Sequence, residues 1–386
     1  MKKYTNLFLI IITSASLVNC KKKKIDVLPS VSHQLSIDNT FGNNGRLVFS
    51  AKDYFKINLL QNYIILSDDP SQSFHGIFSL SKIDYNGASD INYGLGGRLD
   101  ISVNKEVGDA SVLNDGSCWL TYNVGAIHYN NLGYPDDSIP NMVYHIVQYD
   151  ENRLLCFAYD TIYRYYINGT PDLSFGANGF IHGDISYGAM EYLGDFFTCE
   201  GGGIQFLIKK VKANGALDNT FASNGTLDAS IYKGDGYSFK IYNDRIYVFC
   251  SVQNDDYTFS INIKCYSLNG SLDNSFGNSG LLILTYPQAG SSLFTRSVDF
   301  QNDNIYILSG CYKTNVNTKG VLSRVKTNGQ EFKSFGDNGF MLLGDNIGMG
   351  IDMKIKNDNL FALAKYDDGT NTSFTNSTIL LKYLIK

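Results

Sequence analysis

The chain has 386 residues, of which 44% are hydrophobic and 18% are charged. Its 32 Lys and Arg side chains are outnumbered by 37 Asp and Glu side chains, which gives a formal net charge of -5 at pH 7. This mildly acidic balance argues against nucleic-acid binding, because contacts with phosphates need a concentrated basic face.

Residues 1–19 are predicted to be a secretory signal peptide. Two lysines precede an apolar run over residues 7–12, which is too short for a permanent membrane span. The segment Leu17-Val18-Asn19-Cys20 resembles the bacterial lipobox, in which the cysteine is lipidated and becomes the mature N-terminus. Cys20 is therefore the predicted lipidation site, and a plain signal peptide cut nearby is the alternative.

Residues 20–34 are predicted to be the lipidated cysteine followed by a polar tether. Lysines occupy residues 21–24, either as a solvated spacer, which we prefer, or as a contact with anionic lipid headgroups. Surface-exported lipoproteins of some Bacteroidetes-type bacteria carry acidic residues at this point instead. The basic run therefore favours a place on the outer membrane facing the periplasm, with surface exposure as the alternative.

From residue 35 onwards, one short pattern returns throughout the chain. Its clearest copy is GSLDNSFGNSG at residues 270–280: a glycine, an acid three residues later, an aromatic residue after three more, and a glycine after a further four. Other copies begin at residues 35, 87, 169, 215 and 329, and a weaker one covers 133–141. Seven copies at spacings of about 40 to 60 residues indicate a repeat architecture.

Between the copies, the sequence consists of short runs rich in β-branched and aromatic residues, separated by Asn, Asp or Gly turns. Four such runs in each repeat of about 50 residues predict an all-β fold, a seven-bladed β-propeller of four-stranded antiparallel blades over residues 35–386. The second strand of each blade is expected to be apolar on both faces. These strands are predicted near Ile64, Trp119, Leu155, Phe197, Tyr247, Tyr306 and Phe361.

The two ends of this region complement each other. The strand at residues 45–50 has no earlier strands of its own, and STILLKYLIK at the C-terminus is a third strand without a fourth. We therefore expect the N-terminal strand to complete the last blade. Such closure removes the exposed sheet edges that would pair with other chains, so a monomer is expected.

The pattern N-G-x-L-D-x-S-F-G-x-x-G, preceded by an N-D-G-like turn and an apolar strand, resembles the delta-60 repeat family of bacterial β-propellers. The best matching copies are residues 168–179, 214–225 and 269–280, and the resemblance extends from about residue 35 to the C-terminus. It implies a propeller and export, and it implies no defined biochemical activity.

The repeated positions are interpreted as structural. In each copy the acid is expected to cap backbone N–H groups in a turn, the aromatic residue to fill the gap between blades, and the glycine to permit a positive φ. The alternative, calcium or ligand binding by the acids, is disfavoured because each copy offers one acid and calcium needs several converging oxygens. The positions are Asp38, Phe41, Gly45, Asp90, Tyr93, Gly97, Asp136, Asp172, Phe175, Gly179, Asp218, Phe221, Gly225, Asp273, Phe276, Gly280, Phe335 and Gly339.

No catalytic, cofactor-binding or metal-binding motif is predicted. The five histidines stand singly, without the paired spacings of zinc sites. His128 and His145, which flank the irregular second blade, are the best candidates for a site, although ordinary structural histidines are preferred. The six cysteines after Cys20 are expected to be buried and unpaired.

These features predict a membrane-anchored binding or scaffolding module without enzymatic activity, whose loops around the axis contact a protein or glycan ligand. The alternative is an enzyme that acts on carbohydrate or another polymer through acidic residues at the axial mouth. Ionisable groups from different blades gathered in one pocket would favour the enzyme. An axis lined by Ser, Asn and apolar side chains would oppose it.

Overall fold

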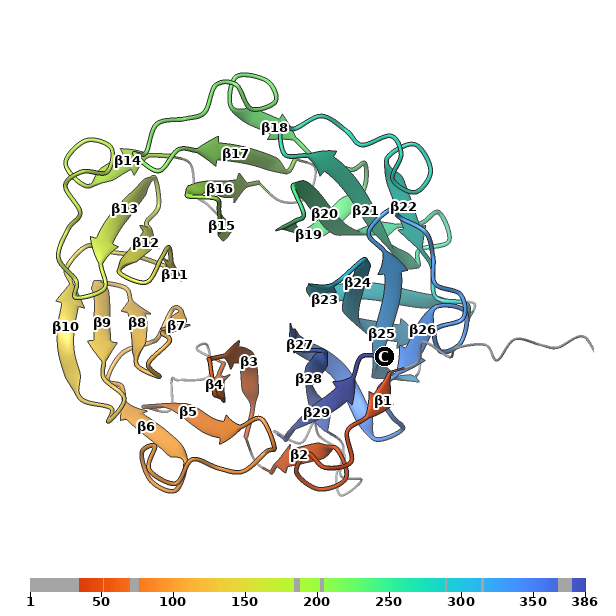
Figure 1. The fold of residues 1–386 in the computed structure, drawn as a ribbon, viewed down its shortest axis with the longest axis horizontal. Coiled ribbons are helices and arrows are strands. Elements are labelled where there is room, and N and C mark those ends of the chain that lie inside the picture. The colour runs from red at the N-terminus through yellow and green to blue at the C-terminus, as the bar shows by residue number, and fades with distance from the viewer. Residues whose placement is uncertain are drawn as a thin grey trace, which may run out of the picture. The chain divides into compact units, whose positions relative to one another are not determined.

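The computed structural model describes residues 35–50, 52–69, 76–183, 188–201, 205–288, 290–313, 316–366 and 377–386. Their strands form seven antiparallel sheets arranged as the blades of a ring (Figure 1). The prediction of a seven-bladed, four-stranded β-propeller is confirmed. In this described part of the chain, no helix is long and apolar enough to cross a membrane.

Each blade begins with the strand that lies nearest the centre of the ring (Figure 1). We number the blades 1 to 7 by these inner strands. They are β3 (Tyr54–Leu59), β7 (Ala110–Val112), β11 (His145–Gln148), β15 (Gly188–Tyr192), β19 (Gly234–Tyr242), β23 (Ser291–Gln301) and β27 (Ile347–Lys356).

The second strands are buried on both faces, and all seven lie where the sequence predicts them. Because side chains alternate along a strand, Tyr247 and Phe249 pack with blade 6, while Ile246 and Val248 pack with blade 4. The second strands are β4 (Tyr63–Asp68), β8 (Cys118–Tyr122), β12 (Arg153–Phe157), β16 (Asp195–Glu200), β20 (Arg245–Gln253), β24 (Asn304–Lys313) and β28 (Asn359–Tyr366).

The third and outer strands complete each blade. The third strands are β5 (Ile77–Asp84), β9 (Gly125–Tyr129), β13 (Thr161–Tyr166), β17 (Leu207–Val211), β21 (Phe259–Ser267), β25 (Val316–Lys326) and β29 (Thr378–Leu384). The outer strands of blades 1 to 6 are β6 (Arg98–Ser102), β10 (Pro135–Ile139), β14 (Phe180–His182), β18 (Thr226–Asp228), β22 (Leu281–Leu284) and β26 (Phe340–Leu342).

Blade 7 is completed from the other end of the chain. Strand β2 (Arg46–Phe49) pairs with β29, with Arg46 opposite Leu381 and Phe49 opposite Thr378. The short β1 (Ser36–Ile37) pairs with the end of the same strand. The predicted closure of the ring by the N-terminal strand is therefore confirmed, and both long edges of β29 are paired.

The six cysteines of the propeller are buried and form no disulfides among the described residues, as predicted. Burial raises the pKa of Cys199 to about 12, so its thiol stays protonated and poorly reactive. Cys20, the predicted lipidation site, lies outside the described residues together with the signal peptide and the tether.

Candidate functional site

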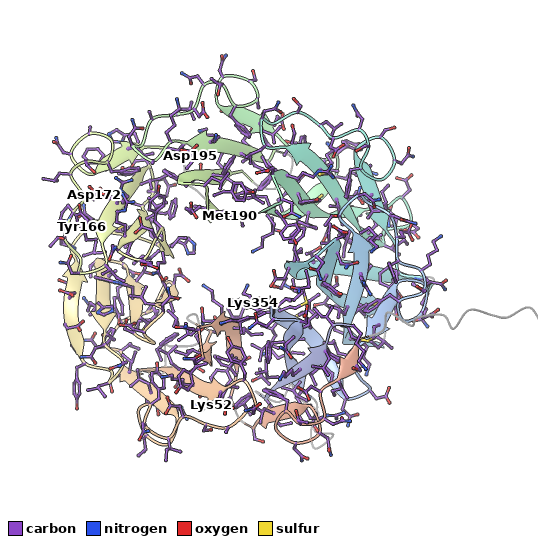
Figure 2. The ribbon with its side chains drawn as sticks, viewed as in Figure 1. Lys52, Tyr166, Asp172, Met190, Asp195 and Lys354 are labelled. Atoms are coloured by element: carbon purple, nitrogen blue, oxygen red, sulfur yellow. The ribbon has the colours of Figure 1, made fainter. Side chains whose placement is uncertain are left out.

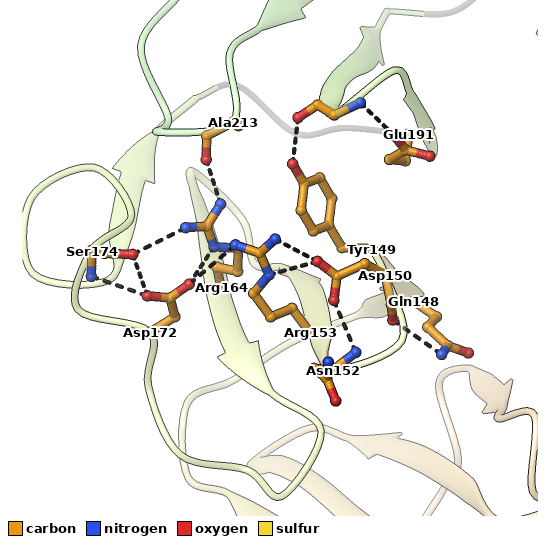
Figure 3. A network of polar contacts seen from close by, with 11 residues as sticks. Gln148, Tyr149, Asp150, Asn152, Arg153, Arg164, Asp172, Ser174, Glu191 and Ala213 are labelled. Carbon is orange, nitrogen blue, oxygen red and sulfur yellow. Dashed lines mark hydrogen bonds and ion pairs between the residues drawn. The ribbon is translucent and has the colours of Figure 1, made fainter.

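The repeated acids hold the turns that lead to the outer strands. Figure 3 shows Asp172, whose Oδ1 accepts hydrogen bonds from the backbone N–H of Ser174 at 3.1 Å and from the Ser174 hydroxyl at 2.5 Å. Its Oδ2 accepts a charged hydrogen bond of 2.7 Å from Nε of buried Arg164. The backbone N–H two residues later is bound in the same way by Asp38, Asp90, Asp218 and Asp273.

A cation on the third strand faces most of these acids. Asp38 is paired with Lys382 at 2.8 Å, which ties the first copy of the pattern to blade 7. The hydroxyl of Thr220 and the ammonium of Lys210 together lower the pKa of Asp218 to about 2. A basic residue eight positions before the acid is a signal in the sequence that could have identified three such pairs: Lys82–Asp90, Arg164–Asp172 and Lys210–Asp218.

Two copies of the repeated pattern lack this pairing of an acid with a basic residue of the third strand, but each has another contact with a cation. Asp273 meets Arg245 of the second strand at 3.3 Å, because Cys265 occupies the third-strand position. Phe332 stands in place of an acid, and the guanidinium of Arg324 lies 4.3 Å from the centre of its ring. A cation–π contact thus replaces the ion pair.

The repeated aromatic residues are buried, and in four copies the residue that follows donates its N–H to the next copy of the pattern. The N–H of Gly176 donates to the carbonyl of Asn214 at 2.9 Å, so the turn of blade 3 is joined to that of blade 4. The same bond joins Gly42 to Asn86, Ala222 to Asn269 and Gly277 to Asn328. The buried rings are Phe41, Tyr93, Phe175, Phe221, Phe276 and Phe335.

The closing glycines share a positive φ and return the chain towards the outer strand. In six copies, the glycine N–H donates to the carbonyl of the aromatic residue, as Gly280 does to Phe276 at 2.8 Å. At Gly280 a Cβ would also lie 2.8 Å from the side chain of Leu272. The φ values are 84° at Gly45, 92° at Gly97, 94° at Gly179, 87° at Gly225, 88° at Gly280 and 95° at Gly339.

Asp136 does not cap the turn that the other five acids cap. In blade 2 the chain continues to pair with β9 where the other blades leave their third strand, so Asp136 lies within β10. Its carboxylate instead contacts Nδ1 of His128 at 2.5 Å. Among the described residues, His128, Asp136 and Asp137 form the one group of three side chains that could together hold a metal ion.

The inner strands place a second set of equivalent side chains around the axis. Figure 2 shows Met190 of β15 and Lys354 of β27 at the inner rim of the ring. Both lie two residues before the end of their strands, and so do Lys240 of β19 and Asp299 of β23. The position is therefore occupied by a thioether in blade 4, a carboxylate in blade 6, and ammonium groups in blades 5 and 7.

At this axial position, an acceptor side chain binds the next blade. Sδ of Met190 accepts a hydrogen bond of 3.2 Å from the N–H of Ile241, and Oδ2 of Asp299 accepts one of 2.6 Å from Ile355. An ammonium group has donors alone, so Lys240 and Lys354 cannot make this contact. Lys240 and Lys354 therefore lie at the position that contacts the next blade, but they cannot accept the backbone hydrogen bond that Met190 and Asp299 accept there.

Lys240 has an unfavourable electrostatic environment. Burial lowers its pKa, and the charge of Lys354 lowers it further, while Asp299 and Asp352 act in the opposite direction. The charge of Lys56 on β3 adds to the repulsion. Within the described ranges, neither Lys240 nor Lys56 has a hydrogen bond or ion pair, and Lys354 has a contact of 3.6 Å with Asp352.

The acids of this axial cluster are engaged with the protein backbone. Asp352 accepts hydrogen bonds from the N–H of Ile57 at 2.9 Å and from the hydroxyl of Ser297 at 2.7 Å, which joins blades 7, 1 and 6. Burial raises the pKa of Asp299, although two backbone N–H groups partly offset this effect. We define the axial cluster as Lys56, Lys240, Asp299, Asp352 and Lys354. Its carboxylates accept hydrogen bonds from backbone N–H groups, and Lys354 alone of its three lysines has an ion-pair contact among the described residues.

A hydrogen bond between a histidine and a carboxylate joins blades 2 and 3. Nδ1 of His145, at the start of β11, lies 2.5 Å from Oδ2 of Asp109. Burial alone would raise the pKa of Asp109, but the hydrogen bond from His145 holds it below its usual value. The carboxylate fixes Nδ1 as the protonated nitrogen, which leaves Nε2 as a hydrogen-bond acceptor or base.

A polar groove between the turns of blades 5 and 6 is a weaker candidate. Arg245, Lys326 and Asp303 line it. Arg245 is already paired with Asp273, and Lys326 lies 5.4 Å from the ring centre of Phe332. The basic side chains of this groove, Arg245 and Lys326, therefore already contact residues of the repeated pattern.

No family model matches the chain, and no curated protein sequence matches it. Among solved structures, the WD40 domain of Neurospora crassa Pan2 is similar over 87% of this chain and 93% of that one, with 10% identity and a TM-score of 0.50. BBS1N, solved in complex with ARL6DN, is similar over 88% and 95%, also with 10% identity and a TM-score of 0.50.

An extracellular domain of a putative hybrid two component system from B. thetaiotaomicron gives a TM-score of 0.43 at 13% identity, over 86% of this chain and 40% of that one. At these identities the similarity concerns the fold alone. The comparisons and the strand topology together show that this chain is a β-propeller.

Proposed function

We propose that this protein is an exported lipoprotein whose propeller binds, without catalysis, a ligand that carries an anionic group such as a carboxylate or phosphate. The axial lysines are the proposed contact. The main support for the proposal comes from Lys240 and Lys354. They occupy equivalent positions in blades 5 and 7, but they cannot accept the hydrogen bond from the next blade that Met190 and Asp299 accept.

Electrostatics support an anion at this place. The charge of Lys354 acts unfavourably on the buried ammonium group of Lys240, and a bound anion would relieve that repulsion. Asp299 and Asp352 relieve it incompletely, because both carboxylates also accept backbone N–H groups. A site of this kind is local, since the whole chain carries a net charge of -5.

Calorimetric titration with inorganic phosphate and pyrophosphate tests the proposal. We expect the wild-type protein to bind one anion and Lys240→Met to weaken binding about tenfold or more, because one charged hydrogen bond contributes about 1.5–3 kcal/mol. Lys354→Met should act in the same direction. Lys233→Met is the matched control, because Lys233 pairs with exposed Asp255 on the surface. Binding unchanged in the Lys240→Met/Lys354→Met double variant, or absent from the wild type, would contradict the proposal.

The anchor is proposed from the lipobox-like residues that end in Cys20, and the repeated pattern supports membership of the delta-60 propellers. Two or more acyl chains would hold the propeller firmly to a membrane, whereas one chain binds marginally. Metabolic labelling with a palmitate analogue should modify the wild-type chain and fail in Cys20→Ala. Persistent labelling of Cys20→Ala would remove the lipoprotein part of the proposal and leave the axial site untouched.

One observation favours the enzymatic alternative. His145 and Asp109 come from different blades, and their contact leaves Nε2 of His145 as a base. The axial cluster also gathers ionisable groups from four blades, as an enzyme would require, but Asp299 and Asp352 are bonded to backbone N–H groups and so give less support. Turnover of a polysaccharide that His145→Gln abolishes and Lys240→Met spares would favour the enzyme over the binding module.

A further inference from the structure

We infer that His128, Asp136 and Asp137 of blade 2 form a binding site for a divalent transition-metal ion. The ligand atoms of the three side chains lie within 4.8 Å of one another. The site is independent of the axial lysines, because it lies on the third and outer strands of blade 2.

A β-bulge brings two consecutive acids to one histidine. Successive side chains of a regular strand point to opposite faces, so neighbours in sequence rarely share a ligand. In β10, however, the register shifts between Pro135 and Asp137, and Asp136 is the extra residue. Asp137 is opposite His128 in the pairing with β9. Because a bulge sets two residues against one on the partner strand, both carboxylates approach the imidazole.

Hydrogen bonds at the buried end of His128 decide its tautomer. The Ser117 hydroxyl lies 2.6 Å from Oδ1 of Asp115, and the Ser117 backbone N–H bonds the same oxygen. An ionised carboxylate accepts hydrogen bonds alone, so the single hydroxyl hydrogen of Ser117 points to Asp115. Nε2 of His128 is 2.9 Å from the same hydroxyl oxygen and must therefore donate to it.

This assignment leaves two acceptors facing each other at the open end of His128. With its proton on Nε2, the neutral imidazole presents a lone pair at Nδ1. Oδ1 of Asp136 lies 2.5 Å from that nitrogen. A second proton on the imidazole would lie between them, whereas a metal ion, with ligand bonds of about 2.0–2.2 Å, would bind beside them and move the two ligand atoms slightly apart.

The third side chain favours the metal. Asp137 has no hydrogen bond or ion pair among the described residues, and an imidazolium bonded to Asp136 would not need it. A metal ion would take Nδ1 and both carboxylates as ligands. Nε2–H would then bond to Ser117, the outer contact that orients metal-binding histidines.

The donor set indicates the class of metal. One imidazole nitrogen with carboxylate oxygens suits Zn²⁺, Co²⁺ or Mn²⁺, whereas Ca²⁺ and Mg²⁺ prefer oxygen alone. The Asp136 side chain is 43% exposed, so water can complete the coordination. Ser117, His128 and Asp136 are connected by hydrogen bonds in the order Ser–His–Asp of a hydrolase triad. The Ser117 side chain is buried, however, and its hydroxyl donates to Asp115, so Ser117 is not a nucleophile.

Titration of tag-free, chelator-treated protein with Zn²⁺ and Co²⁺ tests the inference. We expect calorimetry to find one ion per chain. We also expect Co²⁺ to quench the fluorescence of Trp119, the single tryptophan, whose ring centre is 5.1 Å from that of His128. Asp137→Asn should weaken binding of both ions at least tenfold while leaving the metal-free melting temperature unchanged.

Two further variants separate a metal site from a structural histidine. His128→Gln should abolish the quenching by Co²⁺. Asp90→Asn is the matched control, because Asp90 caps a repeated turn in blade 1, and it should bind both ions as the wild type does. An Asp137→Asn variant with wild-type affinity, or a wild-type protein that binds neither ion at millimolar concentration, would overturn the inference and leave an imidazolium paired with Asp136.

Discussion

Deletion of residues 35–50 is expected to prevent the rest of the chain from folding to a stable monomer. The deletion removes β1, β2 and the fully buried Phe41, and it leaves one long edge of β29 without a partner. An unpaired edge of a largely apolar strand pairs readily with other chains. We expect size-exclusion chromatography to show aggregates, and the emission of Trp119, buried in the native fold, to shift towards that of exposed tryptophan.

A rearranged chain provides the control for this deletion. Ser36 lies opposite Leu384 in the antiparallel pair of β1 and β29, so a short glycine linker can join Lys386 to Leu35 as a hairpin. Moving residues 35–50 to the C-terminus in this way should restore a monomer with native Trp119 emission. A deleted chain that stays monomeric with native emission would show that the N-terminal strand is dispensable.

Phe175→Ala is expected to destabilise the propeller by about 3–5 kcal/mol, the usual cost of emptying a buried aromatic site. The Phe175 side chain is fully buried and fills the space between blades 3 and 4. Its ring centre lies 5.9 Å from that of Phe196 on β16 and 4.6 Å from the guanidinium of Arg164. The loss is a large share of the total stability of a typical domain, about 5–15 kcal/mol.

Urea denaturation followed by Trp119 emission measures this loss. Leu173→Ala is the matched control from the same turn, because the Leu173 side chain is 67% exposed. It should change the free energy of unfolding by about 0.5 kcal/mol or less. Equal effects of the two substitutions would mean that the repeated aromatic residue does not hold adjacent blades together.

The blades could be predicted from the sequence because their signals are local. Each second strand is a short apolar run between turn residues, and strands around Ile64 and Tyr306 have the place and burial that this pattern predicts. Ring closure was also predictable, because one end of the region has a strand too many and the other a strand too few. Because the same sequence pattern occurs in several blades, the blade structure can be recognised even where one copy is irregular.

The axial cluster could not be predicted, because its members come from blades that lie far apart in the sequence. Lys240 and Lys354 each resemble an ordinary polar residue of a strand, and their relation depends on equal positions in two inner strands. The contact of His128 with Asp136 and Asp137 depends on a bulge, which shifts the register by one residue. The regular alternation of a strand would place Asp136 and Asp137 on opposite faces of the sheet, so their common approach to His128 could not be predicted.

The repeated pattern joins one blade to the next, and amide hydrogen exchange can measure how firmly it does so. Gly42, Gly176, Ala222 and Gly277 are exposed residues in turns, yet each donates its N–H to an asparagine carbonyl of the following copy. If these bonds hold the ring, their amides open mainly when blades separate. We predict that the four amides exchange as slowly as those of the buried second strands. Exchange at the rate of an unprotected loop would show that these bonds do not hold adjacent blades together.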